Sequence, residues 1–261
     1  MLDDLTALAL DSHHASECIT AVHRPGADRG STDMEHAFTG VQLGHRITGL
    51  AYARLTHPES GSISANAAIA EGQSARQALE WLSTADGAIP PERMATLNAV
   101  LLAENADVLD RATPPLETVV PFAGAERVGM VGYFTPLVPI LLAAGHTLAV
   151  VELDAATWQT SPRLSVSNDT STLAHCDTVL CTATVLLNGS FNPVRTAAAT
   201  CRRFVMLGPT APLAPTVLAE HGVTHIASRV VANDAAFWSA CHAGADWTPH
   251  TRKFVLETKN A

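Results

Sequence analysis

The sequence lacks long hydrophobic runs and has few basic residues. Its longest apolar stretch, at 137–144, is far shorter than the roughly 20 residues that span a bilayer. Lysine and arginine together number 16 against 25 aspartates and glutamates, and no basic run occurs, so a surface that binds nucleic-acid phosphates is disfavoured. The chain begins MLDDL, which is acidic where a signal peptide is basic. We therefore expect a soluble cytoplasmic protein that binds neither a membrane nor a nucleic acid.

Motifs for metal binding and for nucleophilic catalysis are also missing. The five cysteines form no CxxC and are odd in number, which favours reduced, buried thiols over a disulfide framework. The twelve histidines include no HExxH motif and no Cys/His cluster at zinc spacing, so each is interpreted as an ordinary surface or core histidine. His221 and His225 are four residues apart, but Gly222 between them breaks a common helix. No G-x-S-x-G elbow is present, and Cys181 lies inside a predicted strand, where a core position is favoured.

What the sequence does contain is a clear pattern at 127–154. A hydrophobic content of 47% and a mean hydropathy of +0.16 predict a folded chain with a substantial core. Within 127–154 a short apolar run at 128–131 stops at Gly132, Pro136 suits the first turn of a helix, and Gly145 ends that helix. A second apolar run follows at 148–153. Strand, turn, helix and strand in this order form the opening unit of a doubly wound parallel sheet.

The remaining chain divides at a proline-rich stretch, 113–124. Before it, residues 2–23 predict one helix or two short ones, residues 38–43 and 47–55 predict a hairpin around Gly44-His45, and helices are expected at 74–83 and 91–109. After it, further strands at 177–181, 204–207 and 225–231 alternate with helices at 169–174, 193–201, 213–221 and 234–243. The predicted fold class is α/β, with an N-terminal α+β domain at 1–115 and a parallel sheet covered by helices at 120–261.

Ligands of parallel sheets bind beyond the carboxyl ends of the strands, so the loops there are the candidates. The first loop, Gly132-Tyr133-Phe134, is not a dinucleotide fingerprint, because bulky aromatics stand where G-x-G-x-x-G needs small residues. NAD is therefore disfavoured as a cofactor. Two interpretations of the aromatic pair remain: it stacks on a flat ligand, or it covers the sheet edge.

The other loops carry a carboxylate, hydroxyls and glycine turns. Glu152 stands where such folds place the acid that binds ribose hydroxyls, although a solvated strand end is the plainer interpretation. The hydroxyl, amide and glycine groups serve equally as ligand donors or as ordinary caps and turns. We expect all of them to gather at one edge of the sheet; they are Thr182, Thr184, Asn188, Gly189, Gly208, Pro209 and Thr210.

Several short motifs together resemble one family. They are VGMVGYFTPLVPILLAAGHTLAVVE at 128–152, CDTVLCTATVLLNGS at 176–190 and VMLGPTAPLAPTVLAEHGV at 205–223, with TLNAVLLA at 96–103. This combination, over about residues 36–245, resembles a domain-of-unknown-function family described as "putative heavy-metal chelation". The resemblance implies a Rossmann-like C-terminal domain, an N-terminal domain like that of enolases, and an active site in the cleft between them. The positions that it implies are Gly132, Phe134, Pro136, Glu152, Thr182, Thr184, Asn188, Gly189, Gly208, Pro209 and Thr210, with Asn98 from the N-terminal side.

Two functions are compatible with these residues. The first is binding of a small polar ligand, a metal ion or a metal complex, in the cleft between the domains. Oxygen donors suit Mg²⁺ or Mn²⁺ better than soft metals, and a single carboxylate favours a metal that arrives with its own chelating ligand. The alternative is a small-molecule lyase or transferase that acts on an anionic or adenosyl-type ligand in the same cleft, with Glu152 and Asn188 as catalytic candidates. Enzymatic activity, a divalent metal cofactor and a homo-oligomer stay open at this point.

Overall fold

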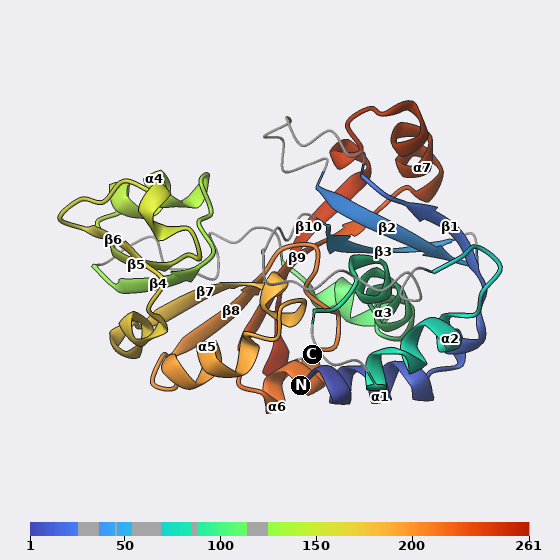
Figure 1. The fold of residues 1–261 in the computed structure, drawn as a ribbon, viewed down its shortest axis with the longest axis horizontal. Helices are drawn as coiled ribbons and strands as arrows, with labels where there is room; N and C mark the ends of the chain where they lie inside the picture. Colours follow the sequence, from blue (N-terminus) through green and yellow to red (C-terminus); the bar gives the residue numbers. More distant parts are fainter. Residues whose placement is uncertain (26–36, 45, 54–68, 85–87, 114–124, 261) are drawn as a thin grey trace.

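The computed structural model describes residues 1–25, 37–44, 46–53, 69–84, 88–113 and 125–260. The chain builds a large, mostly parallel sheet from its C-terminal part and a small antiparallel sheet from its N-terminal part (Figure 1). In the described part, no helix combines the length and the apolar character needed to cross a membrane.

The large sheet has seven strands. Their bounds are β4 Arg127–Val131, β5 Thr147–Val151, β6 Leu164–Ser167, β7 Thr178–Thr182, β8 Arg203–Leu207, β9 His225–Val231 and β10 Thr251–Glu257. The order across the sheet is β10-β9-β8-β7-β4-β5-β6, in which β4 to β9 are parallel and β10 is antiparallel to β9. Counted along the chain, the parallel strands lie in the order 3-2-1-4-5-6, the classic order of a doubly wound sheet. Its switch point lies between β4 and β7.

Short helices connect these strands. They are α4 Leu137–Ala143, η8 Thr170–His175, α5 Phe191–Ala197, α6 Pro215–Glu220 and α7 Asp234–Ala243, with shorter 3₁₀ turns at Ala155–Thr157, Ala183–Leu186 (η9), Thr248–His250 and Thr258–Asn260. Local sequence explains several of the ends. Pro215 opens α6, and the Asn233 side chain accepts a hydrogen bond from the Ala236 N–H at the start of α7. Gly244 ends α7 in the left-handed conformation.

The N-terminal part is a three-stranded meander packed on helices. Its elements are α1 Leu2–Asp11, η1 His13–Ser16, β1 Ile19–His23, β2 Phe38–Leu43, β3 Ile47–Tyr52, α2 Ala75–Glu80, a 3₁₀ turn at Leu82–Thr84, α3 Pro91–Glu104 and η5 Ala106–Arg111. The meander pairs β1 with β2 and β2 with β3, all antiparallel. Strand β3 lies directly on α3, because Gly49 presents no side chain to the backbone of Ala95 and Ala99. Ser74 caps α2 through a complete capping box with Gln77.

The hydrophobic core is continuous between the two parts. One cluster of buried residues runs from Leu5 and the buried face of α3 to Phe204 and Leu256 in the large sheet. A second cluster joins Leu50 of β3 to Phe237 and Trp238 of α7. Helix α7 and the small sheet therefore lie against each other at one end of the molecule, as Figure 1 shows. This arrangement places the carboxyl end of β9, from which α7 leaves, next to β3.

The predicted α/β class and the mostly parallel sheet are confirmed, as is the helix that opens at Pro91. The predicted hairpin is confirmed as the antiparallel pair β2 and β3, while residues 45, 54 and 55 of that prediction lie outside the described residues. Residues 19–23 were expected to be helical, and this was wrong: they form β1, whose pairing with β2 overrides their helical spacing. Strands β6 and β10 were not predicted. Strand β6 is four residues long and half polar, and in β10 the first residue is followed by the charged Arg252 and Lys253, so neither shows a long apolar run. The stretch at 91–109 divides at Asn105 into α3 and η5.

Candidate functional site

The predicted loop residues share one edge of the large sheet. Gly132, Glu152, Thr182 and Gly208 each follow, or end, one of four neighbouring strands, β4, β5, β7 and β8, whose carboxyl ends point the same way. Neighbouring strands are about 4.8 Å apart, so the ends of β5 and β8 are separated by roughly 14 Å. The edge is therefore too wide for one small ligand to contact every predicted residue.

Glu152 holds the loop that follows β4. Its Oε2 accepts a hydrogen bond from the Tyr133 N–H at 2.9 Å, and its Oε1 accepts one from the Leu153 N–H at 2.8 Å. The carboxylate is half-buried. Each oxygen keeps one further lone pair, so Glu152 retains the capacity to bind a ligand while it fixes the backbone of the first loop.

The aromatic pair of the first loop packs against the protein itself. The Tyr133 ring stacks on the Trp158 ring, with centroids 3.8 Å apart and planes inclined by 9°. Phe134 is half-buried and packs on the cluster under α4. Of the two interpretations, these contacts favour a cover for the sheet edge, because the stacking face of Tyr133 that Trp158 occupies is closed to a ligand.

At the switch point the carboxyl ends of β4 and β7 lie close together. Gly132 has φ of +82°, and a Cβ on it would lie 3.2 Å from Cγ2 of Thr182. Thr182 and Thr184 are joined through their hydroxyl oxygens at 3.0 Å, and the Thr182 hydroxyl also accepts from the Thr184 N–H. Both threonines act at least as the cap of the 3₁₀ turn η9.

Asn188 and Gly189 lie on an exposed turn. The Asn188 Oδ1 accepts hydrogen bonds from the N–H and the hydroxyl of Ser190, an Asx turn that occupies the amide oxygen. Gly189 has φ of +73° and an open space around its Cα. The nearby Leu187 carbonyl accepts from the Ile89 N–H, so this loop touches the N-terminal part just before α3.

Asn98 and Thr210 join the two parts. The Thr210 hydroxyl accepts from the Tyr52 N–H at 2.9 Å. The Asn98 Nδ2 donates to the Leu50 carbonyl at 2.7 Å and to the Thr210 carbonyl at 3.0 Å. Both side chains are buried, and the Asn98 Oδ1 has no partner among the described residues. The carboxyl end of β8 is therefore fastened to β3 through the middle of α3.

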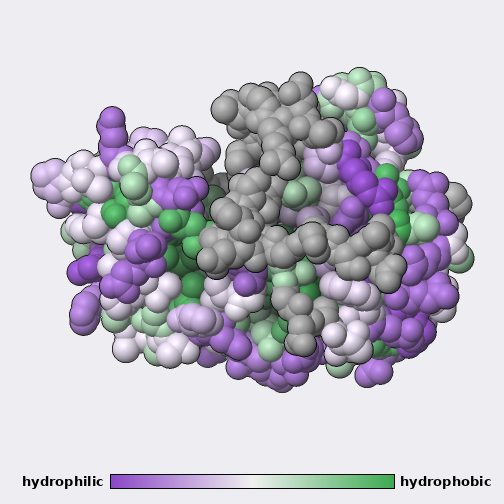
Figure 2. Space-filling view, in the orientation of Figure 1, coloured by the Kyte–Doolittle hydropathy of each residue, from purple (hydrophilic) through white to green (hydrophobic). Residues whose placement is uncertain are grey.

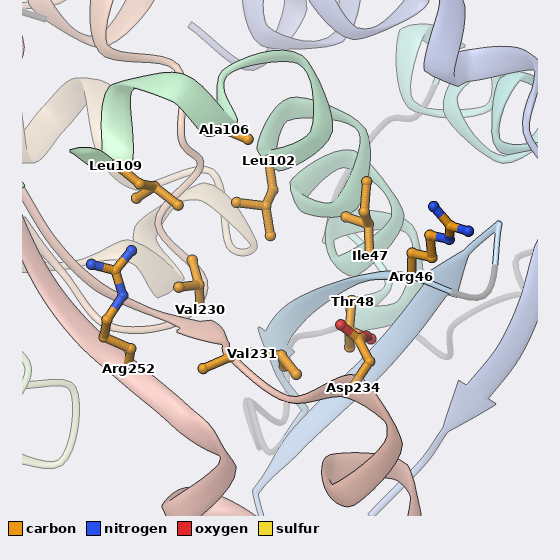
Figure 3. A pocket seen from close by; sticks show the side chains of 11 residues that line it. Arg46, Ile47, Thr48, Leu102, Ala106, Leu109, Val230, Val231, Asp234 and Arg252 are labelled. Carbon is orange, nitrogen blue, oxygen red and sulfur yellow. The ribbon is translucent and has the colours of Figure 1, made fainter. Parts of the chain in front are cut away.

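A cavity lies beside this junction, at the carboxyl end of β9. Its volume is about 340 Å³, which is within the range of small-molecule sites. Strand β3 and the α3–η5 segment line one side of it, and β9, β10 and the start of α7 line the other (Figure 3). Its lining residues are Arg46, Ile47, Thr48, Leu102, Ala106, Leu109, Val230, Val231, Ala232, Asp234 and Arg252. Both parts of the chain thus contribute to one mostly apolar cavity with a few polar groups.

The polar groups of the cavity are partly fixed by their neighbours. The Asp234 Oδ1 accepts hydrogen bonds from the Thr48 hydroxyl and from the Gln42 Nε2, and the Trp238 Nε1 donates to the Thr48 hydroxyl. Among the described residues only the Oδ1 of Asp234 accepts side-chain hydrogen bonds, so its Oδ2 remains available to a ligand. Asp234 is also the first residue of α7, where a negative charge is favoured by the helix dipole.

Two arginines stand at opposite sides of the cavity. Figure 3 shows Arg46, directly before β3, and Arg252 on β10, with Asp234 between them in the view. Within the described ranges neither guanidinium belongs to an ion pair. The charged residues of the lining are two arginines and one aspartate, 2 − 1 = +1, whereas the whole chain has a formal charge of −9. This lining favours an anionic ligand over a bare cation.

A narrower pocket of about 20 Å³, room for one water molecule, adjoins the cavity. The two share Thr48, Leu102 and Val230 in their linings. Asn98 and Pro209, two of the predicted site residues, line the narrower pocket. The other predicted residues line neither space.

Several of the cavity residues were not predicted from the sequence. Thr48 and Asp234 carry no motif, and Arg46 and Arg252 are 206 positions apart. One signal was present: the rule that ligands bind beyond the carboxyl ends of parallel strands applies to β9 as well, and Asn233-Asp234 comes one residue after the end of β9. The contribution of β3 depends on tertiary packing and has no signal in the sequence.

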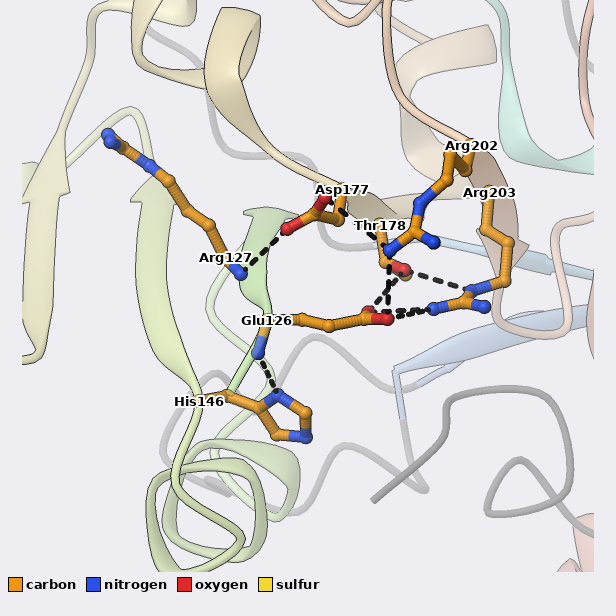
Figure 4. Close-up of polar contacts among 7 residues, drawn as sticks. All are labelled: Glu126, Arg127, His146, Asp177, Thr178, Arg202 and Arg203. Carbon is orange, nitrogen blue, oxygen red and sulfur yellow. Dashed lines mark hydrogen bonds and ion pairs between the residues drawn. The ribbon is translucent and has the colours of Figure 1, made fainter. Parts of the chain in front are cut away.

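The opposite edge of the sheet has a structural ion-pair network (Figure 4). Glu126, just before β4, contacts Arg203 at 2.7 Å and Arg202 at 3.2 Å, and accepts from the Thr178 hydroxyl at 3.1 Å. Burial acts to raise the pKa of Glu126, but the hydrogen bond and charge of Arg203, with the Thr178 and Arg202 contacts, lower it below its usual value. These groups join the amino ends of three strands, far from the cavity along the strand direction.

Comparison with known proteins identifies the family. The family model DUF364, described as "Putative heavy-metal chelation", matches residues 115–259, which is more than half of the chain. The chain belongs to the DUF364 family. No curated protein matches it.

Two solved structures of DUF364 proteins share the fold. One, from Pyrococcus horikoshii, has a TM-score of 0.71 and 18% sequence identity, with 98% of this chain and 99% of that chain covered. The other, from Desulfitobacterium hafniense, has a TM-score of 0.70 and 15% identity, with 98% of each chain covered. Both are described as proteins of unknown function, and at these identities the likeness shows the fold alone. The match over nearly the full length confirms that both parts of the chain belong to one recurring architecture.

Proposed function

We propose that this DUF364 protein binds a small anionic ligand, alone or as a metal complex, in the cavity between its N-terminal part and the end of β9. The observation that supports this proposal is the cavity of about 340 Å³ that both parts line, because its lining has a net positive charge in an otherwise acidic protein. The proposal follows the interpretation of residues 1–115 as an enolase-N-terminal-like domain and of residues 120–261 as a Rossmann-like domain, with the ligand in the cleft between them.

The lining supports a ligand with both a charged and an apolar portion. Arg46 and Arg252 offer donors in a fork geometry that matches carboxylate and phosphate groups. Ile47, Leu102 and Leu109 offer apolar surface on the wall that β3 and the α3–η5 segment form. A ligand that spans the cavity would place its anionic groups toward the arginines and its apolar part on the α3–η5 side.

A bare metal ion fits this cavity poorly. The described lining contains one carboxylate, Asp234, and one hydroxyl, Thr48, which is too few oxygen donors for tight binding of Mg²⁺ or Ca²⁺. Two guanidinium groups nearby would repel a free cation. A metal that arrives already chelated by an anionic ligand avoids both problems, since its ligand carries the charge that the arginines bind and Asp234 needs to supply only one donor.

A thermal-shift screen tests the proposal. Small carboxylates and phosphates, with citrate among them, are offered with and without Mg²⁺, Mn²⁺ or Ni²⁺, and the affinity for each compound that raises the Tm is measured by calorimetry. Arg252→Gln should weaken binding of such a compound by about 10- to 100-fold, because a charge-assisted hydrogen bond contributes about 1.5–3 kcal/mol. Asp234→Asn should weaken the metal complex more than the metal-free ligand.

Arg163→Gln is the matched control. Arg163 is an exposed arginine on the loop before β6, at the far edge of the sheet, and it lines neither cavity. The control variant should bind as the wild type does. Equal loss of affinity in Arg163→Gln and Arg252→Gln would mean that overall charge, not the cavity, determines binding, and would refute the proposal.

A further inference from the structure

Two adjacent histidines and a glutamate from a distant helix meet on the surface of the N-terminal part. One ligand atom from each of His13, His14 and Glu104 lies within 4.8 Å of the others. His13 and His14 open the 3₁₀ turn η1 directly after α1, and Glu104 is the last residue of α3. His13 and Glu104 are exposed and His14 is half-buried, so an ion in solution can reach all three. The face over α1 and α2 is hydrophilic, as Figure 2 shows.

A buried serine, Ser12, forms hydrogen bonds to two residues of the cluster. The Ser12 hydroxyl donates to the Glu104 Oε2 at 2.5 Å and accepts from the His14 N–H at 3.1 Å. Ser12 is 6% exposed, although it is polar. One hydroxyl therefore fixes the carboxylate of α3 against the backbone of η1, and the two chain segments that supply the ligands are held together without a metal.

A second carboxylate orients one of the imidazoles. The His14 Nδ1 lies 2.5 Å from the Glu17 Oε1. A carboxylate can only accept, so Nδ1 is the donor in this contact, and in the neutral imidazole the lone pair then lies on Nε2. A carboxylate that holds the far nitrogen of a ligand histidine is the usual support of a zinc site. The His13 and His14 rings are also in contact, with centroids 3.8 Å apart.

The distances between the three ligand atoms are close to those around a bound metal ion. Donors bound at about 2.1 Å to a tetrahedral ion lie roughly 3.4 Å from one another. The present separations, all within 4.8 Å, are larger by at most about 1.4 Å. Rotation of the exposed His13 side chain, with a small pivot of the Glu104 carboxylate about its contact with Ser12, can close this difference without movement of η1 or α3.

We propose that His13, His14 and Glu104 form a site for a divalent ion of the Zn²⁺ class, with the fourth position left to water or to a solute. Two imidazoles and one carboxylate suit Zn²⁺, Co²⁺, Ni²⁺ and Cu²⁺, and an open fourth position is the pattern of exchangeable rather than buried structural sites. Glu17 and Ser12 are positioning residues: they orient the ligands and do not contact the ion.

This site is independent of the cavity and does not rest on the proposed function. Glu104 is two residues after Leu102, about 200° around the axis of α3, and Leu102 faces the cavity. The metal cluster and the cavity therefore lie on opposite sides of the end of α3, and no residue belongs to both.

Metal titration of the full chain without a histidine tag tests the site. Calorimetry with Zn²⁺ and visible spectroscopy with Co²⁺ should show one saturable site and the absorption of a tetrahedral or five-coordinate Co²⁺ ion. His13→Ala and Glu104→Gln should each weaken the affinity at least 10-fold and change the Co²⁺ spectrum. Glu17→Gln should weaken it about 10- to 100-fold with the spectrum retained, since the ligands are intact.

Two further variants separate the outcomes. His175→Ala removes an exposed imidazole at the end of η8 and should leave the affinity unchanged. Asp234→Asn alters the cavity and should also leave the affinity unchanged. Loss of Zn²⁺ binding in that variant alone would place the ion in the cavity, which would overturn this inference and also contradict the poor fit of a bare metal ion to the cavity. Absence of a saturable site in the wild-type chain, or equal binding by wild type, His13→Ala and Glu104→Gln, would overturn it as well. Circular dichroism of each variant checks that the fold is retained.

Discussion

Replacement of Gly49 by alanine tests the packing that forms one wall of the cavity. A Cβ at this position would overlap the carbonyl oxygen of Ala95 and the backbone nitrogen of Ala99, and would lie 2.9 Å from the Ala99 Cα. These are backbone atoms of α3, so they cannot rotate away. Because carbon contacts become favourable only near 3.5 Å, β3 and α3 must separate by roughly 1 Å.

The expected loss in the free energy of unfolding follows from that separation of β3 and α3. Overpacking of a core costs about 1–3 kcal/mol and occasionally more, and a clash with backbone on a helix places Gly49→Ala at about 3 kcal/mol or above. The movement would also lengthen the hydrogen bond from Asn98 to the Leu50 carbonyl, now 2.7 Å. Since Thr48 of β3 and Leu102 of α3 both line the cavity, we expect ligand affinity to fall together with stability.

Urea unfolding measures the effect, with Gly40→Ala as the matched control. Gly40 is a glycine of the neighbouring strand, and a Cβ there would meet the side chains of Phe237 at 3.5 Å and Leu50 at 3.7 Å, which are ordinary contact distances. We expect the midpoint of Gly40→Ala to stay near the wild type, within about 1 kcal/mol, and that of Gly49→Ala to fall well below it with an unchanged slope. Equal stability of the two variants would refute the reasoning.

Three further predictions concern the ion-pair network, the cysteines and the junction. Glu126→Gln should lower the free energy of unfolding by about 1–3 kcal/mol near pH 7. Burial acts to raise the pKa of Glu126, but Arg203 lowers it below the unfolded value, so this stabilisation is fully present above the unfolded pKa of about 4.3. In denaturant titrations the difference between variant and wild type should shrink as pH falls below that value and vanish below the folded pKa. A disulfide-exchange reagent should modify the exposed Cys18 rapidly. It should modify the fully buried Cys181 only on unfolding, because burial shields this thiol and raises its pKa, and rapid reaction of Cys181 in the native state would contradict its position in the core. Asn98→Ala should lower the free energy of unfolding in urea by roughly 2–5 kcal/mol, because two buried carbonyls each lose a hydrogen-bond donor, at about 1–3 kcal/mol each. A decrease of less than about 1 kcal/mol would show that water replaces the amide.

The sequence predicts the parallel sheet well because its signals are local. A buried parallel strand needs an apolar run on both faces, and the loop that follows it needs a glycine or a cap, as at Gly132 and Gly208. The strands without such a run were missed: β6 is short, and β10 is an edge strand with charged residues at its start. Residues 19–23 show that pairing with a neighbouring strand can override a helical pattern.

The candidate site could be predicted only in part. The edge of the sheet was expected, and Asn98, Pro209 and Thr210 do lie at the junction of the two parts. The cavity itself depends on how β3 and α3 pack against β9, which is a relation between segments more than 100 residues apart in the sequence. The same holds for the metal cluster, because Glu104 approaches His13 only after α1 and α3 have packed.

The most direct test of the central claim is a crystal of the wild-type chain soaked with tungstate, a phosphate-like anion with a strong anomalous signal. The account predicts an anomalous peak in the cavity between Arg46 and Arg252, and its loss in crystals of Arg252→Gln. Peaks only at other surface positions, or a peak in the cavity that Arg252→Gln leaves unchanged, would contradict it.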